Sequence, residues 1–331
     1  MHTKDELAHY PALVQTLLKN RDITTEDEAT KFLNPNYERD VADPFLMFGM
    51  ERAVLRILTA IEAKEKIVIF GDYDCDGIPG SVLLYDFFKK IGYDNIHVYI
   101  PHRHHEGYGM NIPAIETLAR EGAQLLITVD CGITEVAEVA RAHELGIEVI
   151  ITDHHIPSEV LPSAYAIINP KQEGDTYPDK MLCGAGVAWK LVCALLMRGR
   201  EEWNVPEGYE KWLLDMAGLA TIADMVPLQN ENRAIAYYGL TVLRRSRRVG
   251  LKKLLEKTGT LQTSLTEDDI GFTIGPRINA ASRMGIPMDA FRLLSTTNEQ
   301  EAEELAEHLV HLNETRKGLV ASMVKEARKH L

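Results

Sequence analysis

The stretch KIVIFGDYDCDG, residues 66–77, joins a short apolar run to three acidic side chains. The run is continuous and rich in β-branched residues, which is typical of a strand buried on both faces of a parallel sheet. Asp72, Asp74 and Asp76 follow it at alternate positions. Because carboxylates this close repel one another and raise one another's pKa, the pattern predicts that a positive group offsets them.

Three more apolar runs of the same kind follow, at IHVYI (96–100), LLITV (125–129) and EVIIT (148–152). A helix-length amphipathic segment separates each run from the next. This alternation predicts an α/β fold with a doubly wound, mostly parallel sheet and helices on both faces. In such sheets ligands bind outside the carboxyl ends of the strands, where this chain carries GDYDCDG, PHRHHEGYGMN, DCG and DHH. Asp, His and Arg side chains are therefore expected to converge on one edge.

The remaining segments read mostly as helices. Helical apolar spacing predicts a helical N-terminal segment over residues 1–65. Residues 66–297 then form the main domain, which is mostly helical from about residue 184. Residues 298–331 read as a long, charged amphipathic helix that is expected to connect to something beyond it.

Composition narrows the class of protein. Of the 331 residues, 45% are hydrophobic and 26% are charged, as in ordinary globular domains. No stretch approaches the roughly 18 apolar residues of a membrane span and the N-terminus is polar, so we expect a cytoplasmic protein with no membrane partner. Four scattered cysteines without a C-x-x-C pair favour reduced thiols over a disulfide framework or a zinc site.

The formal net charge of −13 argues against a surface that binds nucleic acid throughout. The basic run RRSRRVGLKK, residues 244–253, has two interpretations: a local track for nucleic acid, or an ordinary solvated helix end.

The acidic and histidine side chains at the predicted edge form a set of hard ligands without a thiolate. They are Asp72, Asp74, Asp76, Asp130, Asp153, His154, His155 and Asp224. This mixture favours Mn2+ or Mg2+, and so many carboxylates predict two divalent cations about 3.5–4 Å apart. Asp224 lies in the apolar run LATIADMVPL, where burying an acid is costly unless it is paired or bound to metal. The plainer alternatives are a helix cap for Asp130 and ordinary core or surface positions for the histidines.

Two further segments, PHRHHEGYG and GPRINAASRMG, contribute cationic and amide groups. These are Arg103, Arg277, Asn279 and Arg283. Guanidinium groups beside a metal pair favour a phosphate-bearing substrate, and the alternative is a set of structural salt bridges. Gly184 and Gly186, in CGAGVAWK, fit either a phosphate cradle at a helix start or close helix packing.

Taken in order, these motifs resemble the DHH phosphoesterase superfamily, and within it the RecJ family of single-stranded-DNA exonucleases. The motifs are GDYDCDG, PHRHHEGYG, TVDCG, ITDHH with LPSAYAIINP, LATIADMVPLQNENR and PRINAASRM. The resemblance extends from the N-terminal helical segment through residue 331. It implies that residues 66–297 are a DHH domain and that residues 298–331 lead to a second, DHHA1-like lobe and an OB-like domain, neither of which this sequence contains.

The resemblance also implies roles for single residues. The family's metal ligands match Asp74, Asp76, Asp130, His154 and Asp224. Asp130 would bridge the two ions, and Asp72 would replace a histidine that many relatives carry at the position of Phe70. The implied catalytic residues are Asp130, His155 on the substrate side, Asp153 as its support, and Arg277. Phosphate or strand contacts are implied for Arg103, Tyr108, Asn111, Arg277, Asn279 and Arg283.

The implied activity is hydrolysis of single-stranded DNA from the 5′ end to 5′-mononucleotides, with two Mn2+ or Mg2+ ions, in DNA repair and recombination. A single-strand-binding protein and repair helicases are the implied protein partners. Two alternatives stay open. One is a DHH phosphodiesterase acting on short oligonucleotides, cyclic dinucleotides or pyrophosphate; the other is an inactive scaffold in a replication or repair assembly, whose expected mark is the loss of acids that this sequence retains.

Overall fold

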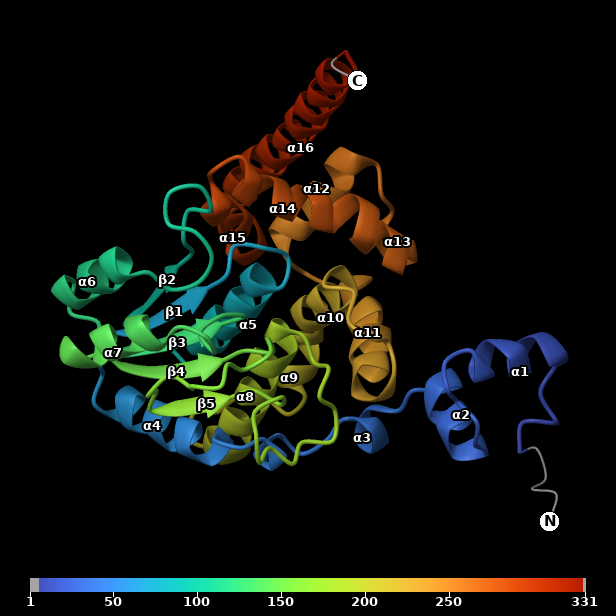
Figure 1. The fold of residues 1–331 in the computed structure, drawn as a ribbon, viewed down its shortest axis with the longest axis horizontal. Helices are drawn as coiled ribbons and strands as arrows, with labels where there is room; N and C mark the ends of the chain where they lie inside the picture. Colours follow the sequence, from blue (N-terminus) through green and yellow to red (C-terminus); the bar gives the residue numbers. More distant parts are fainter. Residues whose placement is uncertain (1–5, 330–331) are drawn as a thin grey trace.

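A computed structural model describes residues 6–329 of the chain (Figure 1). Within these residues the centre of the fold is a sheet of five parallel strands in the order β2-β1-β3-β4-β5. The strands are β1 (Ile67–Gly71), β2 (Ile96–Tyr99), β3 (Leu125–Val129), β4 (Glu148–Thr152) and β5 (Ala166–Ile168). The four strands expected from the sequence are confirmed, and β5 is an additional edge strand.

Helices cover both faces of the sheet, as the doubly wound prediction requires. They are α4 (Met50–Glu62), α5 (Gly77–Lys90), α6 (Ile112–Arg120), α7 (Val136–Glu144) and α8 (Gly184–Gly199). Side chains alternate along β1, so Ile67 and Ile69 join the core formed with α4, α5 and α8, while Val68 and Phe70 join the core formed with α6 and α7. Burial on both faces explains why the strand sequences are continuously apolar.

The strand order places a crevice at the carboxyl ends of β1 and β3. From β1 the chain passes through α5 to β2 on one side, and from β2 through α6 to β3 on the other side. Ligand sites of doubly wound sheets form where the strand order reverses in this way. Two backbone hydrogen bonds continue the pairing of neighbouring strands beyond the ends of β1 and β3. The Asp72 N–H donates to Val129 O, and the Asp130 N–H donates to Thr152 O, both at 3.0 Å. Asp72 and Asp130 therefore both lie at the crevice.

The prediction of a helical N-terminal segment over residues 1–65 is confirmed from residue 6 on, and residues 1–5 lie outside the described residues. Ahead of α4 lie α1 (Ala12–Lys19), α2 (Glu26–Leu33), α3 (Tyr37–Asp40) and the short 3₁₀ helix η1 (Pro44–Leu46). Thr25 and Glu28 form a capping box at the start of α2, which accounts for its position. The helices α1 and α2 enclose a small core of their own, seen to one side of the body in Figure 1, whereas α4 packs into the main core.

The second half of the chain is helical. Its elements are α9 (Tyr209–Trp212), α10 (Leu214–Ala223), α11 (Asn230–Leu243), α12 (Val249–Thr258), η2 (Gln262–Ser264), α13 (Glu267–Asp269), the π-helix η3 (Ile270–Ile274), α14 (Gly275–Arg283), α15 (Pro287–Ser295) and α16 (Glu299–Ala327). The start of α16 packs against α12 and α14, and its end extends away from the body (Figure 1). The long final helix predicted over residues 298–331 is confirmed as α16, and residues 330–331 lie outside the described residues. No helix within residues 6–329 is long and apolar enough to cross a membrane.

Candidate metal centre

The acidic loop after β1 folds into a tight turn at the start of α5. The carboxylate of Asp74 accepts hydrogen bonds from the backbone N–H groups of Asp76, at 2.7 Å, and Gly77, at 3.2 Å. Position 77 requires glycine because a Cβ atom there would lie 2.5 Å from the carbonyl oxygen of Asp72. The turn thus holds three acids close to the end of one strand.

The start of α8 fixes the carboxylate of Asp76. The backbone N–H groups of Gly184 and Ala185 donate to its two oxygens, at 2.6 and 2.7 Å. A Cβ atom on Gly184 would lie 2.5 Å from the Cβ of Asp130, so glycine lets the helix approach β3 closely. Asp76 occupies the N–H of Gly184, and Cys183 Sγ accepts the N–H of Gly186, which argues against a phosphate cradle; close packing explains Gly184.

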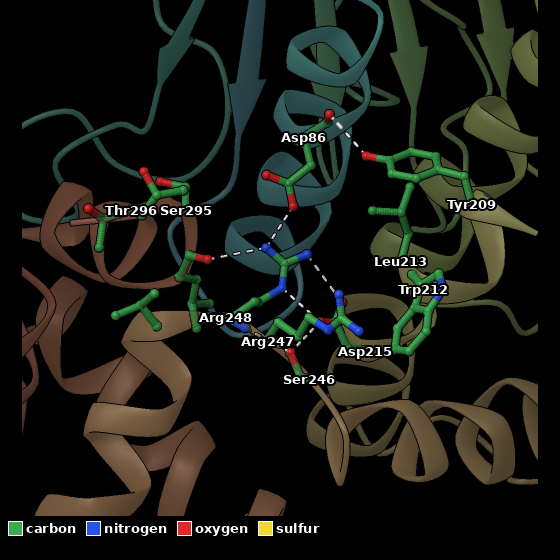
Figure 2. Close-up of a pocket in the computed structure, with 13 residues that line it drawn as sticks. Asp86, Tyr209, Trp212, Leu213, Asp215, Ser246, Arg247, Arg248, Ser295 and Thr296 are labelled. Atoms are coloured by element: carbon green, nitrogen blue, oxygen red, sulfur yellow. Dashed lines mark hydrogen bonds and ion pairs between the residues drawn. The ribbon is translucent and has the colours of Figure 1, made fainter. Parts of the chain in front are cut away.

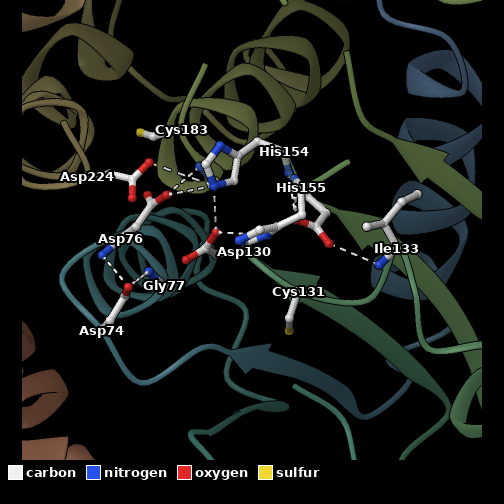
Figure 3. A network of polar contacts seen from close by, with 12 residues as sticks. Asp74, Asp76, Gly77, Asp130, Cys131, Ile133, His154, His155, Cys183 and Asp224 are labelled. Atoms are coloured by element: carbon white, nitrogen blue, oxygen red, sulfur yellow. Dashed lines mark hydrogen bonds and ion pairs between the residues drawn. The ribbon is translucent and has the colours of Figure 1, made fainter. Parts of the chain in front are cut away.

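His154 lies among three carboxylates (Figure 3). Its Nε2 atom is 3.1 Å from Asp130 Oδ1, 3.6 Å from Asp76 Oδ2 and 3.8 Å from Asp224 Oδ2. Asp130 Oδ1 accepts no hydrogen bond, although it is buried and 3.1 Å from the ring nitrogen. These atoms therefore surround a shared space instead of bonding to one another.

Three overlapping groups have ligand atoms within 4.8 Å of one another. They are Asp72 with Asp74 and Asp130, Asp76 with His154 and Asp224, and Asp130 with His154 and His155. Asp130 belongs to two of the groups, which is the position expected of a bridging carboxylate. Its backbone also adopts φ of +62°, in the left-handed region that few residues other than glycine adopt.

The electrostatics of the centre are unfavourable without a cation. Burial, followed by repulsion from Asp74, raises the pKa of Asp72 to about 8, and burial, followed by repulsion from Asp76, raises the pKa of Asp224 to about 7. Burial and neighbouring acids also raise the pKa of Asp130. Burial lowers the pKa of His154, which favours the neutral imidazole that ligates metals. This donor set, buried and rich in carboxylate oxygen, fits hard divalent cations.

His155 is held at the edge of the centre by Asp153. Its Nδ1 atom is 2.8 Å from Asp153 Oδ1, and the other oxygen of Asp153 accepts the N–H of Ile133 at 3.0 Å. The bond to Asp153 raises the pKa of His155. Burial alone would raise the pKa of Asp153, but its hydrogen bonds and the charge of His155 keep that pKa below its usual value. The Tyr108 hydroxyl donates to Asp130 O at 2.9 Å and lies 3.1 Å from His155 Nδ1.

Comparison with known proteins places this centre in a family. Residues 66–221 match the DHH family, N-terminal domain. The chain is 44% identical over 322 residues to the single-stranded-DNA-specific exonuclease RecJ of Bacillus subtilis, which covers 97% of this chain and 39% of the relative. It is also similar to a crystal structure of exonuclease RecJ bound to manganese, with a TM-score of 0.76, 36% identity, and coverage of 85% of this chain and 69% of the other. The chain belongs to the RecJ family.

Another RecJ structure, in complex with Mn2+ and from Thermus thermophilus, matches with a TM-score of 0.80 and 30% identity over 97% of this chain and 45% of that one. The chain spans less than half the length of the Bacillus subtilis RecJ that it matches.

In this RecJ-family chain, an aromatic and basic rim borders the metal centre. The guanidinium of Arg103 lies 4.8 Å from the centre of the Tyr73 ring, and that ring meets Tyr108 edge-on at 6.4 Å. The ring of Tyr108 in turn lies 5.7 Å from that of His155. Sequence reasoning missed Tyr73, although an aromatic residue between two acids of the first motif was a usable signal.

The remaining predicted substrate residues have different surroundings. Asn111 caps α6 by accepting the N–H of Ala114 at 2.9 Å, a structural role that sequence reasoning did not foresee. Asn279 accepts the N–H of Cys75 at 2.9 Å and so ties α14 to the acidic loop.

The arginines of these motifs form no ion pair within the described residues, although the charge of Glu314 partly offsets the lowering of the Arg277 pKa by burial. Arg277 donates to the carbonyl of Thr273 at 2.7 Å, while Arg283 is exposed at the end of α14. Within residues 6–329, neither these two arginines nor Arg103 forms an ion pair with a carboxylate. This argues against the structural salt-bridge alternative.

Two sequence positions near the centre differ from simple expectation. Asp224 does not lie inside the apolar helix but at the C-cap of α10, where its side chain is 28% exposed. Phe70 stacks on Tyr99 at 5.1 Å in the core beneath α6 and supplies nothing to the centre. Asp72 lies with Asp74 and Asp130 instead.

The basic run at residues 244–253 does not form a continuous track. Arg248 lines a pocket of about 390 Å³ and pairs with Asp86 at 2.6 Å and Asp215 at 2.8 Å (Figure 2). Arg244 donates to the carbonyl of Leu265, and Lys253 lies 3.2 Å from Glu303 of α16. Much of its charge therefore serves the packing of helices.

Proposed function

We propose that this chain carries the catalytic site of a metal-dependent exonuclease that hydrolyses single-stranded DNA from the 5′ end to 5′-mononucleotides, in DNA repair and recombination. The observation that carries the proposal is the set of overlapping ligand groups, two of which contain Asp130 and two of which contain His154. Support comes from the family, because relatives are named single-stranded-DNA-specific exonucleases and their crystal structures are described as bound to manganese.

The cofactors would be two divalent cations, Mn2+ or Mg2+. Asp72, Asp74 and Asp130 would hold one, and Asp76, His154 and Asp224 would hold the other. Asp130, whose Oδ1 lies 3.1 Å from His154 Nε2, would be the ligand that the two share. When bound, such ions polarise a phosphoryl oxygen and activate water at neutral pH.

The chain's own residues would orient the strand and hold charge. Asp153 fixes the ring of His155 and favours its protonated form, so His155 would present a proton at the substrate edge. Arg103 and Arg277, which have no acidic partner, would contact phosphate oxygens and stabilise the charge that develops on them. The hydroxyl of Tyr108, which contacts both the backbone of Asp130 and the ring of His155, would fix the position of that ring relative to Asp130.

The test is nucleotide release from 5′-labelled single-stranded DNA with Mn2+, with matched duplex and 3′-labelled strands. Asp130→Ala is the site variant, and Asp94→Ala is the control because Asp94 is an exposed acid ahead of β2. We expect metal-dependent release of mononucleotides by the wild type and by the control only. Release that survives Asp130→Ala would contradict the proposal. Cleavage of a dinucleotide without cleavage of the long strand would favour the short-substrate phosphodiesterase, and metal binding without any cleavage would favour the scaffold.

Three further parts of the proposal rest on the sequence: the location on its composition, the partners on the family resemblance, and the domain division on its patterns and motifs. We propose a cytoplasmic location, and a single-strand-binding protein and repair helicases as partners. The division of the chain at residues 65 and 297 stays a prediction, with residues 66–297 as the DHH domain.

A further inference from the structure

The loop that carries Tyr108 is held in place by a glutamate from another part of the chain. This loop, residues 100–111, joins β2 to α6, and Glu135 directly precedes α7. The Oε2 atom of Glu135 accepts the backbone N–H of Met110 at 3.0 Å. Its Oε1 atom lies against Gly109, where a Cβ atom would be only 1.8 Å away. One side chain therefore contacts both of the residues that follow Tyr108.

The backbone around Tyr108 is one that contacts must restrict. Glycines flank the tyrosine, Gly107 with φ of +86° and Gly109 with φ of +75°, and glycine gives a loop more conformational freedom than any other residue. Ahead of Tyr108, Glu106 accepts the N–H of His102 at 2.7 Å, a contact within the same loop. After Tyr108, the contact with Glu135 ties the loop to a different one.

Glu135 belongs to the loop that begins with Asp130, a proposed metal ligand. Two hydrogen bonds fix this second loop. The N–H of Glu135 donates to Gly132 O at 3.1 Å, and the N–H of Ile133 donates to Asp153 Oδ2 at 3.0 Å. The contact of Glu135 with residues 109 and 110 therefore connects the loop of Tyr108 to the loop that supplies the metal centre.

Tyr108 reaches the centre through its hydroxyl. The hydroxyl donates to Asp130 O at 2.9 Å and lies 3.1 Å from His155 Nδ1. Hydrogen bonds weaken steeply when their geometry is distorted, so a small shift of the loop would weaken both contacts. In the described part of the chain Glu135 bonds to neither Asp130 nor His155, so its influence on them passes through Tyr108.

The contact depends on the length of the Glu135 side chain more than on its charge. Glu135 is half-buried and forms no ion pair within residues 6–329. Burial raises its pKa to about 7, and repulsion from Asp153, directly after β4, and Glu138, on α7, adds to the effect. Since its surroundings disfavour the charge, the useful feature is an acceptor oxygen that reaches the N–H of Met110. Glutamine has the same reach, and aspartate is shorter.

We propose that Glu135 is a positioning residue, which keeps Tyr108 against Asp130 and His155 by holding the backbone that follows Tyr108. This inference rests on the proposed function, because it deepens how the same site places its histidine. Glu135 would contact neither metal nor strand. Its loss should therefore slow hydrolysis without weakening the affinity for Mn2+.

The experiment compares variants that separate reach from charge. Glu135→Gln keeps the length and an acceptor oxygen, Glu135→Asp keeps the charge on a shorter side chain, and Glu135→Ala removes both. The control is Glu144→Ala, which breaks an exposed pair with Arg141 at the other end of α7. Each protein is assayed for nucleotide release from saturating single-stranded DNA over a range of Mn2+ concentrations.

We expect the rate of release to fall about tenfold in Glu135→Asp and Glu135→Ala, because the group that orients His155 is no longer fixed. Glu135→Gln should stay within about threefold of the wild type, and Glu144→Ala should match the wild type. The Mn2+ concentration for half-maximal release should be the same in all of them. In a Tyr108→Phe background, Glu135→Ala should cost less than about twofold, because the hydroxyl through which it acts is already absent.

Two results would overturn the inference. One is a loss of rate in Glu135→Gln with full activity in Glu135→Asp, because the charge would then matter and the reach would not. The other is a pair of losses that multiply in the double variant, because Glu135 would then act independently of the Tyr108 hydroxyl. Glu135→Asp decides the question if Glu135→Ala does not fold.

A readout without catalysis separates this inference from the proposed function. Fluorotyrosine placed at position 108 is observed by fluorine NMR. Its resonance should shift or broaden in Glu135→Asp and Glu135→Ala and stay unchanged in Glu135→Gln. An unchanged resonance in Glu135→Ala would overturn the positioning role. Failure of the proposed function would appear separately, as absence of nucleotide release by the wild type.

Discussion

Two clusters of buried and half-buried carboxylates in the described part of the chain are balanced in different ways. Asp86 and Asp215 share the guanidinium of Arg248 (Figure 2). Burial lowers the pKa of Arg248, but the two carboxylates outweigh it and raise that pKa. At the metal centre, Asp76 accepts hydrogen bonds from backbone N–H groups of α8, and Asp130 lies 3.1 Å from His154, which burial keeps neutral, and 3.8 Å from His155 (Figure 3). The comparison teaches that a cluster of buried acids indicates a cation site where no arginine or lysine side chain pairs with those acids.

The largest effect is expected from a substitution at the metal centre. Asp130→Asn removes the carboxylate shared by two ligand groups, and we expect nucleotide release to fall at least about 10³-fold. In metal-free buffer the same change should not lower the free energy of unfolding, because it relieves repulsion among buried acids. The rate of nucleotide release with Mn2+ checks the loss of activity. Urea denaturation in EDTA checks the stability of the metal-free protein. Retained activity, or a large loss of metal-free stability, would contradict the assignment.

The matching change in the first cluster should act on stability. Asp215→Asn leaves Arg248 short of one buried partner, and we expect a loss of about 3 kcal/mol in the free energy of unfolding. As the control, Glu51→Gln breaks an exposed pair with Arg198 and should cost less than about 1 kcal/mol. Urea denaturation of both variants measures the difference. Equal losses would mean that the buried cluster is no more important than a surface pair.

Added Mn2+ should stabilise the folded protein through the acids of the metal centre and not through Asp86 and Asp215. With free Mn2+ at about 100 times its Kd, the free energy of unfolding should rise by about 2.7 kcal/mol. This Mn2+-dependent rise in the free energy of unfolding should largely disappear in Asp130→Asn and persist in Asp215→Asn. Thermal unfolding with and without Mn2+ gives the comparison, and an increment that is the same in both variants would place the ions elsewhere.

Glu135, a half-buried acid outside both clusters, gives the smallest expected effect. Burial raises the pKa of Glu135 to about 7, and repulsion from Asp153 and Glu138 adds to the effect. Since the folded pKa exceeds the unfolded one, the stabilising contribution is complete below about pH 4.5 and is lost as pH rises to about 7. Urea midpoints should therefore fall less with pH in Glu135→Gln than in the wild type. Parallel curves for the two proteins would contradict this.

The sequence predicted the parts of the fold that depend on local pattern. The apolar runs of β1 to β4 have the length and composition of buried strands, and the motifs at their ends identified most of the centre. The strand β5 was missed because it has only three residues, Ala166–Ile168, and follows a long irregular segment. A strand of three residues is too short for the alternating pattern of apolar side chains to be detected.

The parts that escaped prediction depend on which side chains meet across the fold. Nothing local distinguishes Arg248, which is paired with two acids, from its neighbour Arg247, which is exposed. Asn111 is a different case, because it caps α6 through a bond from Ala114 three residues on, which is a local signal that was overlooked. Residue type and spacing indicate candidates, and only the three-dimensional arrangement shows which of them have partners.

The most direct test of the central claim is anomalous diffraction at the manganese edge from crystals of this chain grown with Mn2+. The account predicts two peaks, one beside Asp72, Asp74 and Asp130 and the other beside Asp76, His154 and Asp224, with Asp130 between them. Absence of both peaks, or peaks only at other positions, would contradict the claim that the unpaired acids form a centre for two cations.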